Sequence, residues 1–179
     1  MNSNWGIWIS EVLTAVAHLF FLWCFFIKRR PRLLATNTVG NVVMIAGLSL
    51  ISAWAGLVTL AIGIGRDSTN FLIDKYKWHR LHYASLIVWL CTFIVASVFL
   101  WQSLGSVLIL AAGVLFTVAI WQKSIPLFRL IAIIVNALWV FYLFYVGNVS
   151  GSYMRMALLG FSVVGLVSYF AMRPWARNR

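Results

Sequence analysis

Seven long apolar runs, separated by short polar breaks, dominate this sequence. They cover approximately residues 5–27, 33–51, 53–73, 81–100, 104–122, 126–146 and 152–171. Each run has about 20 residues, the length that an α-helix rising ~1.5 Å per residue needs to cross the hydrocarbon core of a bilayer. Hydrophobic residues make up 63% of the chain and charged residues 9%, which excludes a soluble enzyme and a disordered protein. We expect an all-α membrane protein with seven transmembrane helices, forming a single integral membrane domain over residues 1–179.

The basic residues alternate between the two sides of these runs. There are 14 Lys and Arg residues against only Glu11, Asp67 and Asp74, so the formal net charge is +11. Because the basic residues cluster between apolar runs, this charge indicates a membrane surface and not a nucleic acid as partner. The breaks after the first, third, fifth and seventh runs are basic, whereas the other breaks contain no Lys or Arg. The positive-inside rule then predicts an N-terminus outside and a C-terminus in the cytoplasm.

Several other classes of site and segment are not expected. No basic residue precedes the first run, so we expect it to remain as a span and not to be cleaved as a signal peptide. Cys24 and Cys91 lie inside apolar runs and are expected to be small packing residues. His79 and His82 are too few for a metal site. With no nucleophile and base set, metal-ligand cluster or phosphate-binding loop, the sequence predicts neither an enzyme nor a cofactor or metal site.

The first three runs resemble the last three. In each triplet a basic break leads to a helix that starts at a proline and has an arginine near its inner end, Arg32 or Arg129. A turn of small residues and a third helix follow. The fourth run carries the chain back across the membrane, which gives a 3+1+3 arrangement of two parallel triple-helix repeats. The expected parts are repeat one over about 5–73, a linker helix over about 81–100 and repeat two over about 104–171. Parallel repeats of this kind are a known plan of transporters, with the site at the repeat interface.

Three groups of residues add a family resemblance. They are Ala55-Gly56 followed by Arg66, Trp121-Gln122-Lys123 followed by Arg129, and Trp139-Val140-Phe141-Tyr142 leading into Gly147-Asn148-Val149-Ser150-Gly151. In these pieces the chain resembles the YgjV-type bacterial inner membrane proteins, a family without an established activity. It departs from them at Met154-Arg155, where an acidic residue is expected. The resemblance implies a multi-pass protein of the bacterial inner membrane. The 3+1+3 architecture also resembles that of the SWEET and PQ-loop transporters, although the chain contains no Pro-Gln pair.

Ionisable residues inside the runs are the first candidates for a site. Each costs roughly 2.5–3.5 kcal/mol on insertion, so such residues usually have a function. Glu11, Thr14 and His18 are spaced i, i+3, i+7 and therefore share one helical face. Arg66 and Asp67 lie at about the depth of His18.

Polar amides in two other runs reach the same layer. Asn37 and Asn41 are one turn apart in the second run, and Asn136 lies near the middle of the sixth, with Trp139 one turn further. Four helices thus offer polar groups at one level of the membrane. The predicted substrate-binding residues are Glu11, His18, Asn37, Asn41, Arg66, Asp67, Asn136 and Trp139.

Simpler interpretations of these residues stay open. Arg66 could extend its aliphatic stem to the cytoplasmic surface, or the third run could end at Gly65 and leave residues 66–68 in a loop. The three asparagines could only join helices by hydrogen bonds. His18 could be a buried packing residue, and Trp139 could fill the bundle.

Together these patterns predict a carrier for a small polar solute, anionic or sugar-like, that binds between the two triplets. The alternative is a non-transporting structural or accessory membrane protein. A solute-accessible cavity between the triplets favours the carrier, and a dry, filled interface favours the alternative. The expected partners are the lipid bilayer and the solute; the sequence specifies no oligomeric state.

Overall fold

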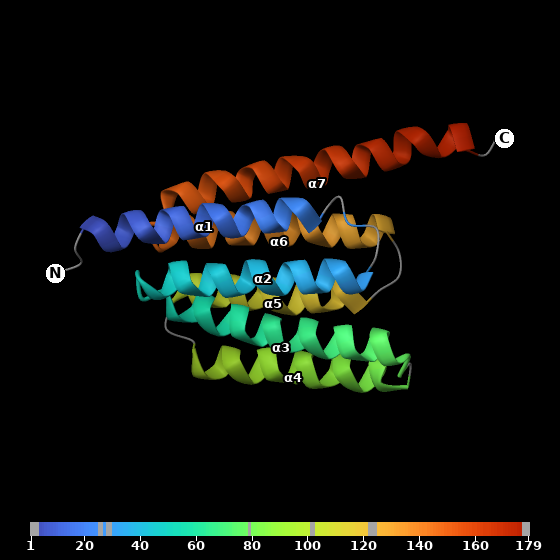
Figure 1. Ribbon diagram of the computed structural model, residues 1–179, viewed down its shortest axis with the longest axis horizontal. Coiled ribbons are helices and arrows are strands. Elements are labelled where there is room, and N and C mark those ends of the chain that lie inside the picture. Colours follow the sequence, from blue (N-terminus) through green and yellow to red (C-terminus); the bar gives the residue numbers. More distant parts are fainter. Residues whose placement is uncertain are drawn as a thin grey trace.

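The described part of the chain folds into seven α-helices (Figure 1). The computed structural model describes residues 4–24, 27, 30–78, 80–100, 103–121 and 125–176, and this part of the chain contains no strand. The helices are α1 (Asn4–Cys24), α2 (Arg30–Ser49), α3 (Trp54–Tyr76), α4 (Leu81–Phe99), α5 (Leu104–Trp121), α6 (Ile125–Tyr145) and α7 (Val149–Ala176). The prediction of an all-α protein is confirmed, and each predicted run corresponds to one helix.

Five of the described helices, namely α1, α4, α5, α6 and α7, are long and apolar enough to cross a membrane. Helices α2 and α3 are as long, with 20 and 23 residues, but they are less apolar. They contain the polar residues Asn37, Asn41, Arg66 and Asp67, and they pack beside the other helices in the same bundle. That α2 and α3 also cross the membrane stays a prediction. The lower apolar character of α2 and α3 thus reflects polar groups that they supply to the interior.

The helices run along the long axis of the molecule, with the start of α1 and the end of α7 at opposite ends (Figure 1). At one end of the molecule, α1 and α3 finish and α2 and α4 begin. We call it the basic end, because Lys75, Lys77 and Arg80 lie there. At the other end α2 finishes and α3 begins around Ser52, and we call it the Ser52 end. Which end faces the cytoplasm stays a prediction.

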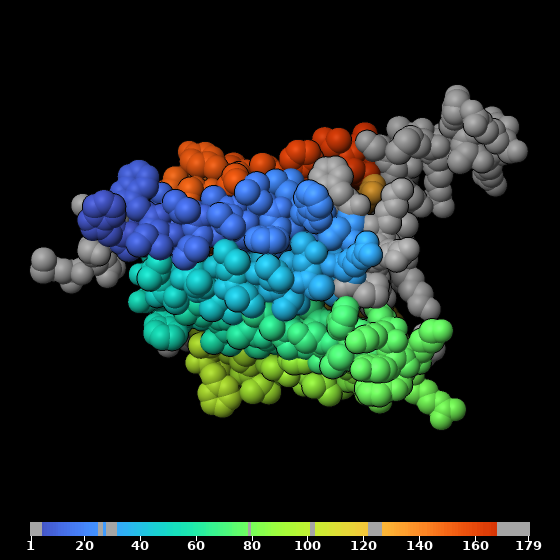
Figure 2. All heavy atoms as spheres, in the orientation of Figure 1, coloured from blue at the N-terminus to red at the C-terminus, as the bar shows by residue number. Residues whose placement is uncertain are grey.

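Six helices close into a ring. Helix α1 packs against α2 and α7, α2 against α3, α3 against α5, α5 against α6, and α6 against α7. Helix α4 packs outside the ring against α3 and α5, and Figure 2 shows the face that α1, α2, α3 and α4 form side by side. Helices α2 and α6 lie on opposite sides of the ring without close backbone contact in the described chain. The outer position of α4 suits a linker helix, whereas the equivalence of the two triplets stays a prediction.

Glycines fix the position of α4. A Cβ atom on Gly65 would lie 2.5 Å from Trp89, and one on Gly113 would lie 2.3 Å from Phe93. The two aromatic side chains of α4 therefore pack directly against the backbones of α3 and α5. Most of the remaining α4 surface is exposed and apolar, as expected for a helix that faces lipid.

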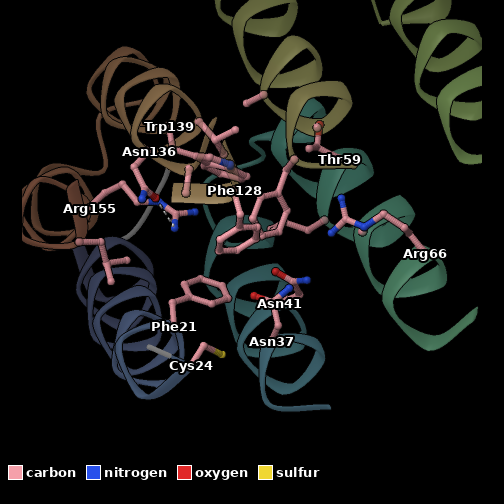
Figure 3. A pocket seen from close by; sticks show the side chains of 18 of the residues that line it. Phe21, Cys24, Asn37, Asn41, Thr59, Arg66, Phe128, Asn136, Trp139 and Arg155 are labelled. Atoms are coloured by element: carbon pink, nitrogen blue, oxygen red, sulfur yellow. Dashed lines mark hydrogen bonds between the residues drawn. The ribbon is translucent and has the colours of Figure 1, made fainter. Parts of the chain in front are cut away.

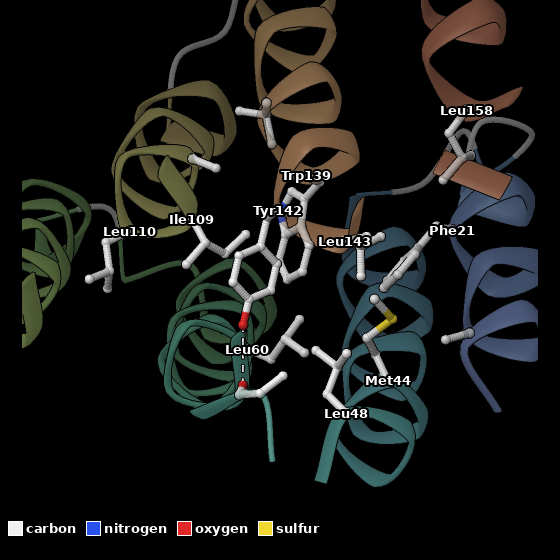
Figure 4. Close-up of a cluster of buried hydrophobic side chains, with 14 of the residues drawn as sticks. Phe21, Met44, Leu48, Leu60, Ile109, Leu110, Trp139, Tyr142, Leu143 and Leu158 are labelled. Carbon is white, nitrogen blue, oxygen red and sulfur yellow. Dashed lines mark hydrogen bonds between the residues drawn. The ribbon is translucent and has the colours of Figure 1, made fainter. Parts of the chain in front are cut away.

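A buried apolar cluster closes the ring toward the Ser52 end (Figure 4). It includes Leu48, Leu143 and Tyr142. The Tyr142 hydroxyl accepts a hydrogen bond from the Gly56 N–H at 2.7 Å and donates one to the Ala53 carbonyl at 3.3 Å. A Cβ atom on Gly56 would lie 2.7 Å from this hydroxyl, so a residue without a side chain is needed there. Tyr142 thus binds the first turn of α3, whose N–H groups have no partner within the helix.

The turn predicted over residues 147–151 is shorter in the structure, because α7 already begins at Val149. The Asn148 side chain caps the helix: its Oδ1 accepts a hydrogen bond from the Gly151 N–H at 2.8 Å. Its Nδ2 donates to Thr14 Oγ1 at 3.0 Å, which joins the start of α7 to α1.

Candidate functional site

A cavity of about 340 Å³ lies inside the ring, and residues from all seven helices line it (Figure 3). The lining includes Ile27, Leu33 and Phe128, so the cavity extends toward the basic end. The apolar cluster around Tyr142 covers its other side. At ~30 Å³ per water molecule, the space corresponds to roughly ten waters, enough for a small organic solute.

A buried ion pair lies on the α3 side of the cavity. The Nε and Nη2 atoms of Arg66 are each 2.8 Å from Oδ1 of Asp67, and Nη1 donates to Thr117 Oγ1 at 3.2 Å. The other carboxylate oxygen of Asp67 accepts a hydrogen bond from Asn37 Nδ2 at 2.5 Å. The Arg66 guanidinium also stacks over the Phe116 ring, with 4.9 Å between its carbon and the ring centroid. All three nitrogens of the Arg66 guanidinium and both carboxylate oxygens of Asp67 therefore have a polar partner, and the pair is formally neutral.

Two simpler interpretations of Arg66 are wrong. Arg66 is only 2% exposed, so its side chain does not reach the surface. Helix α3 continues to Tyr76, so residues 66–68 are helical and do not form a loop after Gly65. The ion pair with Asp67 explains the first observation, because it allows the guanidinium to remain inside the bundle.

Further polar lining comes from α2 and α6. Gly63 has no side chain, and a Cβ atom there would lie 3.6 Å from Asn41 and 3.8 Å from Arg66, so both side chains border the space in front of it. On α6, Asn136 Nδ2 donates to Ser162 Oγ at 3.2 Å. The Trp139 ring is 5% exposed and also borders the cavity. Of the residues predicted from sequence, the cavity brings together Asn37, Asn41, Arg66, Asn136 and Trp139, with Asp67 directly behind Arg66.

The cavity does not include Glu11 and His18. His18 is fully buried, but its Nδ1 is bonded to the Thr14 carbonyl at 2.6 Å and its ring packs edge-on against Phe21. Glu11 is half-buried and does not line the cavity. The spacing correctly placed these residues along one helix, but α1 turns Phe21 and Cys24 toward the cavity instead.

Of the two histidines near the start of α4, the structure describes His82. His82 Nε2 lies 3.3 Å from Asp74 Oδ1, so it pairs with a carboxylate at the basic end. His79 lies outside the described residues. Across the described ranges, no three His, Cys, Asp or Glu side chains are close enough to bind one metal ion.

Arg155 on α7 is the main cavity residue that sequence reasoning missed. It is 8% exposed, and its guanidinium carbon lies 4.9 Å from the Trp139 ring centroid and 5.1 Å from that of Phe21. Its Nη1 donates to Asn136 Oδ1 at 3.3 Å, whereas its buried Nε has no hydrogen-bond partner in the described chain. The sequence did contain a signal. Arg155 lies inside a predicted span, three residues after its start at Ser152, and an ionisable residue inside a span is the feature that identified Arg66.

A third arginine, Arg129, lines the cavity near the basic end and donates from Nη1 to the Gly165 carbonyl, joining α6 to α7. Asp67 balances the charge of Arg66, whereas Arg155 forms no ion pair within the described residues. The α7 side of the cavity therefore attracts anions.

Comparison with known protein families gives one clear result. The family model Imp-YgjV, described as a bacterial inner membrane protein, matches residues 8–173. Comparisons with curated proteins and with solved structures gave no significant match.

Proposed function

The chain belongs to the Imp-YgjV family of bacterial inner membrane proteins, and we propose that it acts there as a carrier for a small polar solute. The observation that supports this is the cavity between the two helix triplets, with polar groups from α2 and α3 facing others from α6 and α7. An unfilled interior lowers the stability of a bundle in proportion to its volume. A purely structural helix bundle would gain nothing from keeping this space open.

We propose that the basic end faces the cytoplasm, as the distribution of Lys and Arg predicts. The cavity then extends toward the cytoplasm, and the cluster around Tyr142 separates it from the outside. This arrangement corresponds to one state of an alternating-access carrier, in which the other state opens the Ser52 end. Facilitated diffusion is the simplest mode, because it needs no coupling ion.

We propose transport and not catalysis for this cavity. Of the described residues that line it, Cys24 carries the one strong nucleophile, and no histidine or carboxylate is present among them to activate its thiol. Its polar side chains instead surround a space that a solute could occupy.

The carrier function can be tested by filling the cavity. A larger side chain at Gly63 would project into the cavity beside Asn41 and Arg66, at ordinary contact distance for its Cβ atom. Gly160 offers a matched control, because it is exposed and a Cβ atom there would have no neighbour within 4 Å. The measurement is the uptake of a mixture of small polar metabolites into proteoliposomes, quantified by mass spectrometry, for wild type, Gly63→Leu and Gly160→Leu.

We expect the wild-type protein to admit at least one solute faster than protein-free liposomes. Gly63→Leu should slow this uptake at least about tenfold, equivalent to roughly 1.4 kcal/mol of lost binding, while Gly160→Leu should retain it. Uptake that is equal in both variants, or absent from wild type, would favour the non-transporting accessory role.

A further inference from the structure

The charge of Arg155 is not balanced by any carboxylate in the described part of the chain. The only acidic residues of the protein are Glu11, Asp67 and Asp74. Asp67 pairs with Arg66, Asp74 lies at the basic end beside His82, and no ion pair joins Glu11 to Arg155. A buried charge without a counter-charge is costly. Arg155 therefore has the properties of a binding group whose anionic partner comes from outside the chain.

We propose that the solute is a small organic carboxylate with an apolar body, and that Arg155 binds its carboxylate group. This inference rests on the proposed carrier function. The Trp139 and Phe21 rings cover Arg155 at 4.9 and 5.1 Å, which stabilises the cation. A guanidinium has five N–H donors in its plane, and only Nη1 is engaged, by Asn136. The opposite edge, formed by Nε and Nη2, has the geometry that binds a carboxylate through two parallel hydrogen bonds.

Arg66 is not equivalent to Arg155. Its Nε and Nη2 edge is already occupied by Asp67, and its Nη1 by Thr117. The two arginines enter the cavity from opposite sides, as Figure 3 shows. The neutral Arg66 pair, together with Asn37 and Asn41, suits a hydroxyl or carbonyl substituent on the far end of the solute. The charge of the solute is therefore assigned to the α7 side.

The apolar lining of the cavity indicates the chemistry of the rest of the solute. Between these polar groups the lining is mostly apolar and rich in aromatic rings: Phe21, Phe93, Phe116, Phe128, Val135 and Leu158. Each buried methylene group contributes ~0.8 kcal/mol to binding in such surroundings. Inorganic phosphate could not use these walls, and a polyol would leave most of its hydroxyl groups without partners. A ring-sized acid uses both the walls and Arg155.

Matched probes can test this inference. Benzoate and benzamide have nearly the same shape, but only benzoate carries a charge at neutral pH. The melting temperature of the purified protein is measured against increasing benzoate, benzamide, glucose and inorganic phosphate, for wild type, Arg155→Gln and Arg32→Gln. Arg32 is exposed at the basic end, so Arg32→Gln removes the same charge without touching the cavity.

Benzoate should raise the melting temperature of wild type and Arg32→Gln with concentration, as ligand linkage requires. The apparent affinity should be at least about tenfold weaker for benzamide, equivalent to roughly 1.4 kcal/mol, and equally reduced for benzoate on Arg155→Gln. Should Arg155→Gln fail to fold, the wild-type cavity residue Cys24 provides a second measurement. In a Cys91→Ala background, benzoate but not benzamide should slow its modification by N-ethylmaleimide.

Three results would overturn the assignment. They are equal stabilisation by benzoate and benzamide, undiminished benzoate binding to Arg155→Gln, and stabilisation by glucose or phosphate but not by benzoate. Failure of this inference is distinguishable from failure of the carrier function. Uptake of an uncharged solute that Gly63→Leu blocks would leave the carrier intact without a carboxylate site, whereas the absence of all uptake would remove both.

Discussion

Two arginines in one cavity are stabilised in different ways. Arg66 forms a neutral pair with Asp67, whereas Arg155 relies on two aromatic rings and one amide. The first arrangement holds helices together, since the same group of residues connects α3 to Thr117 on α5 and to Asn37 on α2. The second leaves a charge available to a ligand. Substitutions at these residues should therefore differ in effect.

Asp67→Asn should destabilise the protein strongly. It keeps the shape of the side chain but leaves the buried Arg66 charge unbalanced, a change that typically costs about 3 to 5 kcal/mol. Asp74→Asn is the matched control, because Asp74 is in a partly exposed pair with His82 and should cost less than about 1 kcal/mol. The free energy of unfolding of both variants in detergent checks this. Similar losses in the two variants would show that Arg66 does not depend on Asp67.

At the residue scale, the sequence predicted part of the site. Arg66, Asn41 and Asn136 were found because polar groups inside apolar runs are rare and therefore informative. Glu11 does not line the cavity, because helical spacing shows which residues share a face but not which face points inward. Arg155 was missed because it was treated only as a departure from the family pattern. Its lack of a carboxylate partner became visible only when the helices were assembled.

At the scale of elements, two hydrogen-bonded contacts join the triplets at the Ser52 end. Tyr142 of α6 binds Gly56 and Ala53 at the start of α3, and Asn148 before α7 binds Thr14 of α1. Both contacts pair a residue of the first triplet with one of the second. Opening the Ser52 end, as a carrier must, requires such contacts to loosen.

Tyr142→Phe should weaken this end of the bundle. It removes the hydroxyl from the buried Gly56 N–H, and an unsatisfied buried donor costs about 1 to 3 kcal/mol. Tyr145→Phe makes the same change one turn away on a side chain that is 63% exposed, and should have little effect. Hydrogen exchange should become faster over residues 53–60 in Tyr142→Phe alone. Unchanged exchange there would mean that the hydroxyl does not hold α3.

Helix ends were harder to predict than helices. The apolar runs identified every helix, because burial in lipid or protein requires such runs. Helix α3 extends past the predicted residue 73 until Lys77, which adopts the left-handed conformation with φ 58°. Helix α7 starts early because Asn148 caps it. The end of α3 and the start of α7 both depend on local hydrogen bonds, which cannot be predicted from hydropathy.

At the scale of the whole molecule, the ring could not be derived from the sequence. Every run is apolar, so hydropathy does not distinguish the face that meets another helix from the face that meets lipid. The contacts that close the ring, α1 with α7 and α3 with α5, join helices far apart in the chain. The outer position of α4 is compatible with the predicted 3+1+3 arrangement, which itself stays a prediction.

We propose that the ring encloses a water-filled cavity that solutes reach from the cytoplasm. The protein has two native cysteines: Cys24 lines the cavity, whereas Cys91 lies on the exposed side of α4. A methanethiosulfonate reagent reacts with the thiolate, which forms only where water is present. The direct measurement is therefore the labelling of Cys24 by a membrane-impermeant, anionic methanethiosulfonate in a Cys91→Ala background.

We expect Cys24 to react in inverted membrane vesicles and not in intact spheroplasts. A Cys24→Ala protein that keeps Cys91 serves as the control and should not react from either side, because lipid covers that face of α4. Labelling of Cys24 from the outside alone would reverse the proposed orientation. A Cys24 that reacts from neither side until the protein is denatured would show a dry, filled interface and contradict the carrier.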